Sequence, residues 1–213
     1  MTGKIKLVHS GGNAVSIAVP TSNPSSSEVE FKLPQADGTS GQALVTDASG
    51  NLSFAGTGKL LQVVSTTRTD TFSESLATGT LSADALTVNI TPSNANNKIF
   101  LTAHVSMGLN NDNEVNWVFY KAGSLLTGAA GTAAGNRKPR TSAGDVRWTG
   151  THNTTGGQYL DTAGGTSQIT YSVRLGHSAN GTKTVYLNRS HTDDNYAYDI
   201  RTQSTLTVME VAA

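Results

Sequence analysis

Residues 99–107 read Ile-Phe-Leu-Thr-Ala-His-Val-Ser-Met, and this stretch is the clearest structural signal in the chain. Every second residue in it is apolar, from Ile99 to Met107. A period of two residues is that of a β-strand with one buried face, because successive side chains of a strand point to opposite faces. The pattern therefore predicts one face in a core and one face away from it. The predicted core face is Ile99, Leu101, Ala103, Val105 and Met107, and the opposite face is Phe100, Thr102, His104 and Ser106.

Further strands of this kind are predicted on both sides of that stretch, and no helical period stands out among the 213 residues. Alternation of apolar and polar residues favours antiparallel sheets, in which one face of each strand is solvated. We therefore predict an all-β protein in which residues 58–213 form an antiparallel, jelly-roll-like β-sandwich. The strands predicted in this region are 59–67, 86–90, 99–107, 115–120, 169–175, 184–187 and 203–211.

The composition narrows the classes of function. Lys and Arg number 15, as do Asp and Glu, so the formal net charge is zero and no nucleic-acid partner is expected. The absence of cysteine excludes disulfides and thiolate chemistry. No apolar stretch reaches the roughly 18 residues of a membrane span. The amino terminus lacks the apolar segment of a signal peptide, so we expect synthesis in a cytoplasm and no membrane insertion.

Residues 1–57 carry only short predicted strands, separated by turn residues such as the Ser-Gly-Gly-Asn at 10–13. Strands this short do not bury a core within one chain. Three copies around one axis would provide a shared apolar interior, and the alternative is packing onto the larger domain of the same chain. The strands predicted here are 4–9, 14–19, 28–33, 42–46 and 52–54, with a linker at 55–58.

Residues 31–54 contain Leu-Pro, then Asp-Gly, then Gly-Gln-Ala-Leu-Val-Thr-Asp and Gly-Asn-Leu-Ser-Phe. This segment resembles one found in bacteriophage tail-fibre proteins, especially those of marine and cyanobacterial phages, and residues 3–13 are similar to the opening of such proteins. Residues 58–107 resemble a C-terminal β-sandwich domain at the ends of phage fibres. Together these resemblances cover roughly half of the chain.

The resemblance implies a homotrimer in the virion, docked to other virion proteins through residues 1–57 and in contact with a host-surface glycan or protein. We expect a non-enzymatic short tail fibre or fibre tip. The alternative is a head fibre or capsid decoration protein of the same structural family, which the short region before the sandwich would suit. A glycan-active enzyme or a lectin-like domain is the third possibility.

A receptor-binding surface is predicted in the loop at residues 188–200, because binding residues concentrate on loops and exposed aromatic rings stack on sugars. Trp148, Tyr159 and Tyr186 are further aromatic candidates, for which a place in the core is the alternative. The candidate receptor-binding residues are Arg189, His191, Asp193, Asp194, Tyr196 and Tyr198.

We predict no catalytic residues, no metal site and no cofactor. His191, Asp193 and Asp194 form the tightest group of potential metal ligands, and we interpret them as part of a solvated loop. The basic run Arg137-Lys138-Pro139-Arg140 is interpreted in the same way, with contact to an anion or phosphate as the alternative.

Overall fold

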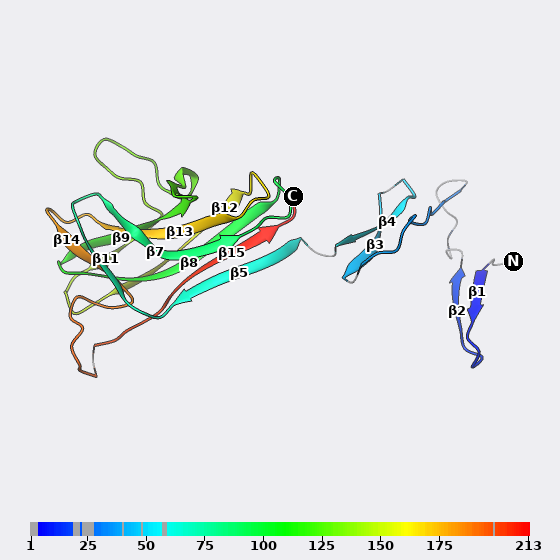
Figure 1. Cartoon of the computed structure of the whole chain (residues 1–213), viewed down its shortest axis with the longest axis horizontal. Helices are drawn as coiled ribbons and strands as arrows, with labels where there is room; N and C mark the ends of the chain where they lie inside the picture. Colours follow the sequence, from blue (N-terminus) through cyan, green and yellow to red (C-terminus); the bar gives the residue numbers. More distant parts are fainter. Residues whose placement is uncertain are drawn as a thin grey trace. The chain divides into compact units, whose positions relative to one another are not determined.

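A computed structural model of the chain describes residues 4–18, 22, 28–39, 41–47, 49–56, 59–197 and 199–213. The chain divides into two compact units, Met1–Gly58 and Lys59–Ala213, and both consist of β-strands (Figure 1). The first unit contains β1 (Lys4–Val8), β2 (Ala14–Ala18), β3 (Gln42–Thr46) and β4 (Leu52–Gly56). The second unit contains β5 (Leu60–Arg68), β6 (Phe72–Leu76), β7 (Leu81–Ile90), β8 (Lys98–Leu109), β9 (Asn113–Lys121), β10 (Ser124–Leu125), the short 3-10 helix η1 (Thr127–Ala129), β11 (Ser142–Val146), β12 (Asn153–Thr162), β13 (Ile169–His177), β14 (Lys183–Leu187) and β15 (Ser204–Val211).

The second unit is a sandwich of two antiparallel sheets. One sheet has the order β5-β15-β8-β12. Beyond the end of β15, β14 pairs with β8, and β6 pairs with β14. The other sheet has the order β7-β13-β9-β11, and β10 also pairs with β9. Figure 1 shows the first strand, β5, beside the last strand, β15. This is the strand order of a jelly roll, so the predicted all-β, jelly-roll-like sandwich is confirmed for the second unit.

Strand β8 alternates as predicted, and the five residues of its predicted core face are all buried. They pack against side chains from the facing sheet, among them Trp117 and Phe119 of β9, whose rings meet edge to face at 4.9 Å between centroids. On the opposite face of β8, His104 is exposed, but Ser106 is fully buried. The reason is tertiary: the segment between β14 and β15 lies over Ser106, and the Thr202 hydroxyl donates a hydrogen bond to its Oγ at 2.7 Å.

Four strands of the second unit were not predicted, namely β6, β10, β11 and β12. The sequence of β12 contains two adjacent glycines, which normally weaken a strand. A Cβ on Gly157 would lie 2.7 Å from the Trp117 ring, so a residue without a side chain is required opposite this tryptophan. Thr155, two residues earlier, accepts a hydrogen bond from Trp117 Nε1 at 2.8 Å. The glycine thus belongs to the core packing and does not mark a loop.

In its described residues, the first unit forms two hairpins, β1-β2 and β3-β4. The strand predicted at 28–33 is wrong: there Lys32 makes only an isolated parallel bridge to Asn51, in which its N–H donates to the Gly50 carbonyl and its carbonyl accepts from the Leu52 N–H. The predicted linker at 55–58 is wrong for residues 55 and 56, which close the β3-β4 ladder through the pair Gln42 and Gly56. Residues 57 and 58 lie outside the described residues.

The first unit has no core of its own in the part that the structure describes. None of its described side chains is buried, and several large apolar ones are well exposed. Ile5 is 66% exposed and its cross-strand neighbour Ile17 is 69% exposed. The exposed apolar side chains of this unit are Ile5, Leu7, Val8, Ile17, Val29, Phe31, Leu33, Leu44, Val45 and Phe54.

A buried carboxylate closes one end of the sandwich core. Glu210, on the inward face of β15, is fully buried and accepts hydrogen bonds from Asn97 Nδ2 at 2.6 Å, from Gln62 Nε2 at 2.5 Å and from the backbone and hydroxyl of Ser93 at 2.7 and 2.8 Å. Burial by itself raises the pKa of this carboxyl group, but the four donors favour the charged form more strongly and lower the pKa from 4.5 to about 2.

Because the pKa of Glu210 is lower in the folded chain, its charge stabilises the fold fully above about pH 5, and this stabilisation is lost as the pH falls towards 2. Glu210→Gln places an NH2 group against these donors and is expected to cost about 1–3 kcal/mol at neutral pH. The variant should also show a flatter stability curve between pH 5 and 2. Urea unfolding of both proteins at several pH values measures this, with the exposed Asp112→Asn as control. Parallel pH curves for wild type and Glu210→Gln would contradict the assignment.

Candidate functional site

The predicted binding loop connects β14 to β15 and is held by one buried asparagine. Asn188 has a positive φ of 64°, which asparagine tolerates better than most residues. Its Nδ2 donates to the backbone carbonyls of Arg68 at 2.8 Å and of Asp70 at 2.9 Å, and Ser204 Oγ donates to its Oδ1 at 2.6 Å. The Thr202 backbone N–H donates to the Asn188 carbonyl at 3.0 Å. Asn188 therefore joins the two ends of the loop and ties both to the end of β5.

A glycine in β8 lets the loop lie close against the sheet. A Cβ on Gly108 would be 2.4 Å from the Arg189 carbonyl oxygen and 3.0 Å from Cα of Ser190. Both are backbone atoms, so no side chain at position 108 fits without moving the loop. The start of the loop is thus packed on a rigid strand, and this fixes the positions of the residues that follow.

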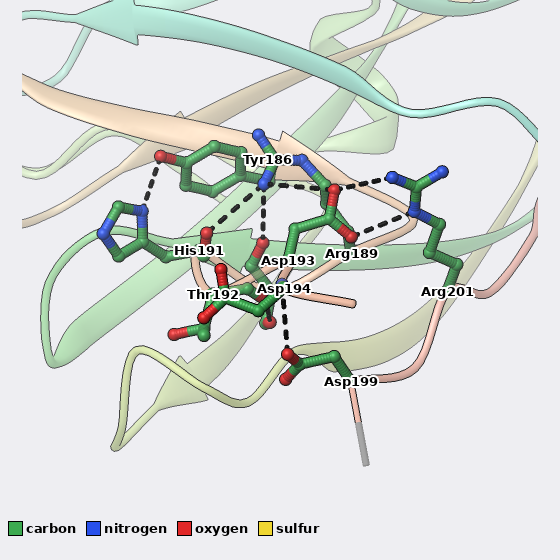
Figure 2. A network of polar contacts seen from close by, with 9 residues as sticks. Tyr186, Arg189, His191, Thr192, Asp193, Asp194, Asp199 and Arg201 are labelled. Atoms are coloured by element: carbon green, nitrogen blue, oxygen red, sulfur yellow. Dashed lines mark hydrogen bonds and ion pairs between the residues drawn. The ribbon is translucent and has the colours of Figure 1, made fainter. Parts of the chain in front are cut away.

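The first part of the loop is organised around Tyr186, the buried ring near the end of β14 (Figure 2). The Arg189 guanidinium lies over this ring, with Cζ 4.2 Å from the centroid, a favourable cation–π geometry. The Tyr186 hydroxyl is 2.8 Å from Nδ1 of His191. Arg189 Nη1 also donates to the backbone carbonyls of Ser190 and His191, both at 3.3 Å. Arg189 and the imidazole of His191 are therefore engaged within the loop.

Two acidic residues hold the second part of the loop (Figure 2). Asp193 accepts hydrogen bonds from Nε of Arg201 at 2.9 Å and from its Nη2 at 2.8 Å, a bidentate ion pair. The hydrogen bonds from Arg201 are the main cause that lowers the pKa of Asp193. The Asp199 carboxylate accepts from the Asp194 backbone N–H at 3.1 Å.

The loop is joined to a second loop, between β11 and β12. The backbone N–H groups of His191 and Thr192 both donate to the carbonyl oxygen of Thr149, at 3.1 and 3.3 Å. Trp148, the neighbour of Thr149, is 65% exposed, and Tyr196 in the β14–β15 loop is 58% exposed. We call residues 147–152 and 188–203 the paired loops. They place large exposed rings on segments whose backbones are fixed by hydrogen bonds to each other and to the sheet.

The structure thus separates the predicted site residues into two groups. Arg189, His191 and Asp193 contribute internal contacts that shape the loop, whereas the side chains of Asp194 and Tyr196 are exposed. Tyr198 lies outside the described residues. One contributor was missed, the guanidinium of Arg201.

No local pattern identifies Arg201, because its role comes from the ion pair with Asp193 that the folded loop brings together. Of the three aromatic candidates, Tyr186 is buried, Tyr159 packs against the core and Trp148 is exposed. In the described residues, no group of three or more His, Cys, Asp or Glu side chains is arranged to hold a metal ion. The same residues include no helix with the length and apolar character needed to cross a membrane.

We expect Asn188→Ala to loosen the loop, because the change removes the three hydrogen bonds of the Asn188 side chain and leaves an alanine at positive φ. The expected loss of stability is about 2 kcal/mol or more. Trypsin should then cut after Arg189 and Arg201 faster than in the wild type, as followed by mass spectrometry of the fragments. Asn195→Ala, at an exposed position of the same loop, is the matched control. Equal cleavage rates in all three proteins would show that Asn188 does not hold the loop.

Comparison with known proteins assigns no family: no family model matches the chain. No curated protein matches it either. Twelve chains of solved structures are similar to it. One belongs to the structure of infectious bursal disease virus Gx strain, with 18% sequence identity and a TM-score of 0.35. The match covers 94% of this chain and 47% of that chain, so this chain spans about half the length of the protein it resembles there.

Proposed function

We propose that the chain is a structural protein of a bacteriophage virion, a short trimeric tail fibre or fibre tip that takes part in host attachment. Its role is assembly and binding, without catalysis. The proposal rests on the exposure of apolar side chains throughout the described part of residues 1–58. The same region resembles phage tail-fibre proteins. The jelly-roll order is a fold-level analogy, since jelly rolls serve both viral capsids and lectins.

Exposed apolar strands of this kind favour association with other copies of the chain. Ile5 and Ile17 face each other across the β1-β2 ladder, and each leaves about two thirds of its surface exposed. Removing apolar surface from water stabilises an assembly by about 25 cal/mol per Å². Copies arranged around one axis would bury these side chains symmetrically. The number three comes from the resemblance to phage fibres.

The sandwich carries a second apolar feature, on the outer face of the sheet β5-β15-β8-β12. Val63, Met209, Phe100 and Leu160 are direct neighbours in the ladders and form one apolar row across the four strands. Val63 and Leu160 are each 53% exposed. We call these four residues the apolar row and propose that it contacts a second copy. The adjacent row is polar: Ser65, Thr207, Thr102 and Gln158.

Host contact is proposed for the paired loops. Exposed aromatic rings give rigid, amphipathic contact area at low entropic cost, and they stack on sugar rings or insert into protein pockets. Trp148 and Tyr196 supply such rings, with the Asp194 carboxylate available for polar contacts. Because the backbone of both loops is held in place, little ordering entropy is lost on binding.

The purified chain is expected to have a mass of about 66 kDa by light scattering, three times 22.1 kDa. Charges introduced at apolar contacts should dissociate the trimer, because an unpaired charge resists burial. Two double variants test the two surfaces separately: Ile5→Asp with Ile17→Asp, and Val63→Asp with Leu160→Asp.

Ser65→Asp with Gln158→Asp is the matched control for the apolar row, since these exposed positions lie on the same two strands, one row away. The control should remain trimeric. A monomeric wild type at micromolar concentration would contradict self-association altogether. A trimer unaffected by the variants at 63 and 160 would remove the apolar row from the interface.

Trp148→Ala with Tyr196→Ala is expected to reduce binding of the trimer to host cells by at least about 30-fold, the effect of losing about 2 kcal/mol at an aromatic hot spot. The melting temperature and the mass should stay close to those of the wild type, because both side chains are exposed. Thr87→Ala, an exposed position on the other sheet, is the control. Unchanged binding would exclude the paired loops as the contact surface.

Gold labelling of virions separates a tail position from a head position, and labelled heads would favour the decoration role.

A further inference from the structure

A pocket of about 410 Å³ lies on the outer face of the sheet β7-β13-β9-β11. Asn116 lines it from β9, and because its neighbours Val115 and Trp117 belong to the core, its own side chain points to the outer face. The turn between β6 and β7 and the basic run at 137–140, which precedes β11, form further walls. The volume lies within the range of about 300–1,000 Å³ that is usual for small-molecule sites.

The cations of this pocket are not neutralised within the chain. In the part that the structure describes, none of Arg137, Lys138 and Arg140 forms an ion pair with a carboxylate. Glu114 is the acidic residue of the lining, and its Oε2 accepts from the Ser178 hydroxyl at 3.0 Å. Among the Lys, Arg, Asp and Glu side chains of the lining, three positive charges and one negative charge leave a net charge of +2.

Arg140 is held in a fixed orientation at this pocket. Its Nε donates to Asn116 Oδ1 at 2.6 Å. Nη1 donates to the Pro139 carbonyl at 2.8 Å, and Nη2 donates to the Gly79 carbonyl at 3.2 Å. All three acceptors are neutral, and each terminal nitrogen keeps a second N–H. Burial lowers the pKa of Arg140, because its charge is incompletely solvated. An oxyanion in the pocket would compensate this cost, since a guanidinium pairs strongly with such groups.

Asn116 adds a neutral donor to the same pocket. Its side chain is 6% exposed, and because a guanidinium only donates, the amide atom that faces Arg140 is the oxygen. Nδ2 is therefore a donor, and the described residues offer it no hydrogen-bond partner. This nitrogen is not fully enclosed, so a molecule in the pocket can reach it. Since polar groups in buried side chains are rarely left unsatisfied, Nδ2 provides a further contact for an acceptor.

We propose that this pocket binds a phosphate group, held by Arg140, by Asn116 Nδ2 and by the exposed cations of the basic run. A phosphate monoester carries a charge of about −1.5 to −2 at pH 7 and three acceptor oxygens, which suits a lining of net charge +2 with several separate donors. A carboxylate carries one charge and two oxygens in one plane, so it would leave part of the lining unpaired.

The pocket is larger than one phosphate group, and the remaining volume has room for the organic part of a phosphate ester. The lining residues differ from those of the paired loops, so the proposal does not rest on the function proposed for those loops.

NMR titrations of the full-length protein at constant ionic strength test the proposal with glucose 6-phosphate and glucose 6-sulfate, two esters of similar shape. Glucose 6-phosphate is expected to bind at least about tenfold more tightly, the effect of one additional charge-assisted contact. Equal binding of the two esters would overturn the choice of phosphate. An absence of glucose 6-phosphate binding would overturn the site.

Inorganic phosphate, added as a competitor, distinguishes the source of the phosphate group. It is expected to displace glucose 6-phosphate, and failure to compete would overturn the proposal, because the ester would then bind through its sugar. Weaker binding than that of the ester identifies a phosphorylated organic molecule as the ligand, whereas tighter binding identifies free phosphate. Both of these orders support a phosphate site.

Arg137→Ala with Lys138→Ala is expected to weaken glucose 6-phosphate binding about tenfold at an unchanged melting temperature, because both side chains are exposed. Arg147→Ala is the matched control: this arginine is also exposed, lies outside the pocket lining and is paired with Asp145. Unchanged binding in the double variant would overturn the proposal. Equal loss in the control would also overturn it, since general surface charge would then attract the ligand.

Asn116→Asp separates binding from stability. The carboxylate has nearly the shape of the amide, pairs with the Arg140 guanidinium and replaces the donor Nδ2 by a negatively charged oxygen. The variant is therefore expected to weaken glucose 6-phosphate binding by at least about 30-fold, while its melting temperature stays equal to that of the wild type or rises. Binding as tight as that of the wild type would show that the phosphate group lies elsewhere and would overturn the proposal.

Discussion

The second unit depends on the register of β8. This strand pairs with β12 along one edge and with β15 and β14 along the other, and its inward side chains fill the middle of the core. A shift of one residue would exchange Leu101 for Thr102 at the centre of the sandwich and misplace every neighbouring strand. The ladders, the inter-sheet packing and the closing Glu210 cluster all depend on this one alignment.

The same strand also determines where the exposed rings lie. The buried end of β8 supports the β14–β15 loop through Ser106 and through the missing side chain of Gly108, while Asn188 holds both ends of the loop. The β11–β12 loop is then attached through the carbonyl of Thr149. Binding surfaces built on a rigid scaffold in this way retain their geometry without a ligand, which lowers the entropic cost of contact.

The two units obtain stability in different ways. The sandwich buries a continuous core within one chain, including large side chains such as Trp117 and Tyr171. The described part of the first unit buries none of its side chains, and its hairpins are of a size that is marginal in water. In the proposed function, the exposed apolar side chains of the first unit become buried when further copies of the chain assemble. The apolar row lies on the sandwich, and contact with a second copy would bury it in the same way.

The sequence by itself determined the fold class and most of the long strands, because a strand with one buried face shows its period of two residues directly, as at 99–107. It also located the β14–β15 loop, where polar and aromatic residues follow one another without such a period. Only the tertiary structure decided that β12 is a strand, since Gly157 is required by the Trp117 ring on the facing sheet. It also decided that Tyr186 is buried while Trp148 is exposed, and that Arg189 and Asp193 shape the loop. These properties arise from contacts that form only in the folded chain, and local sequence patterns do not indicate such contacts.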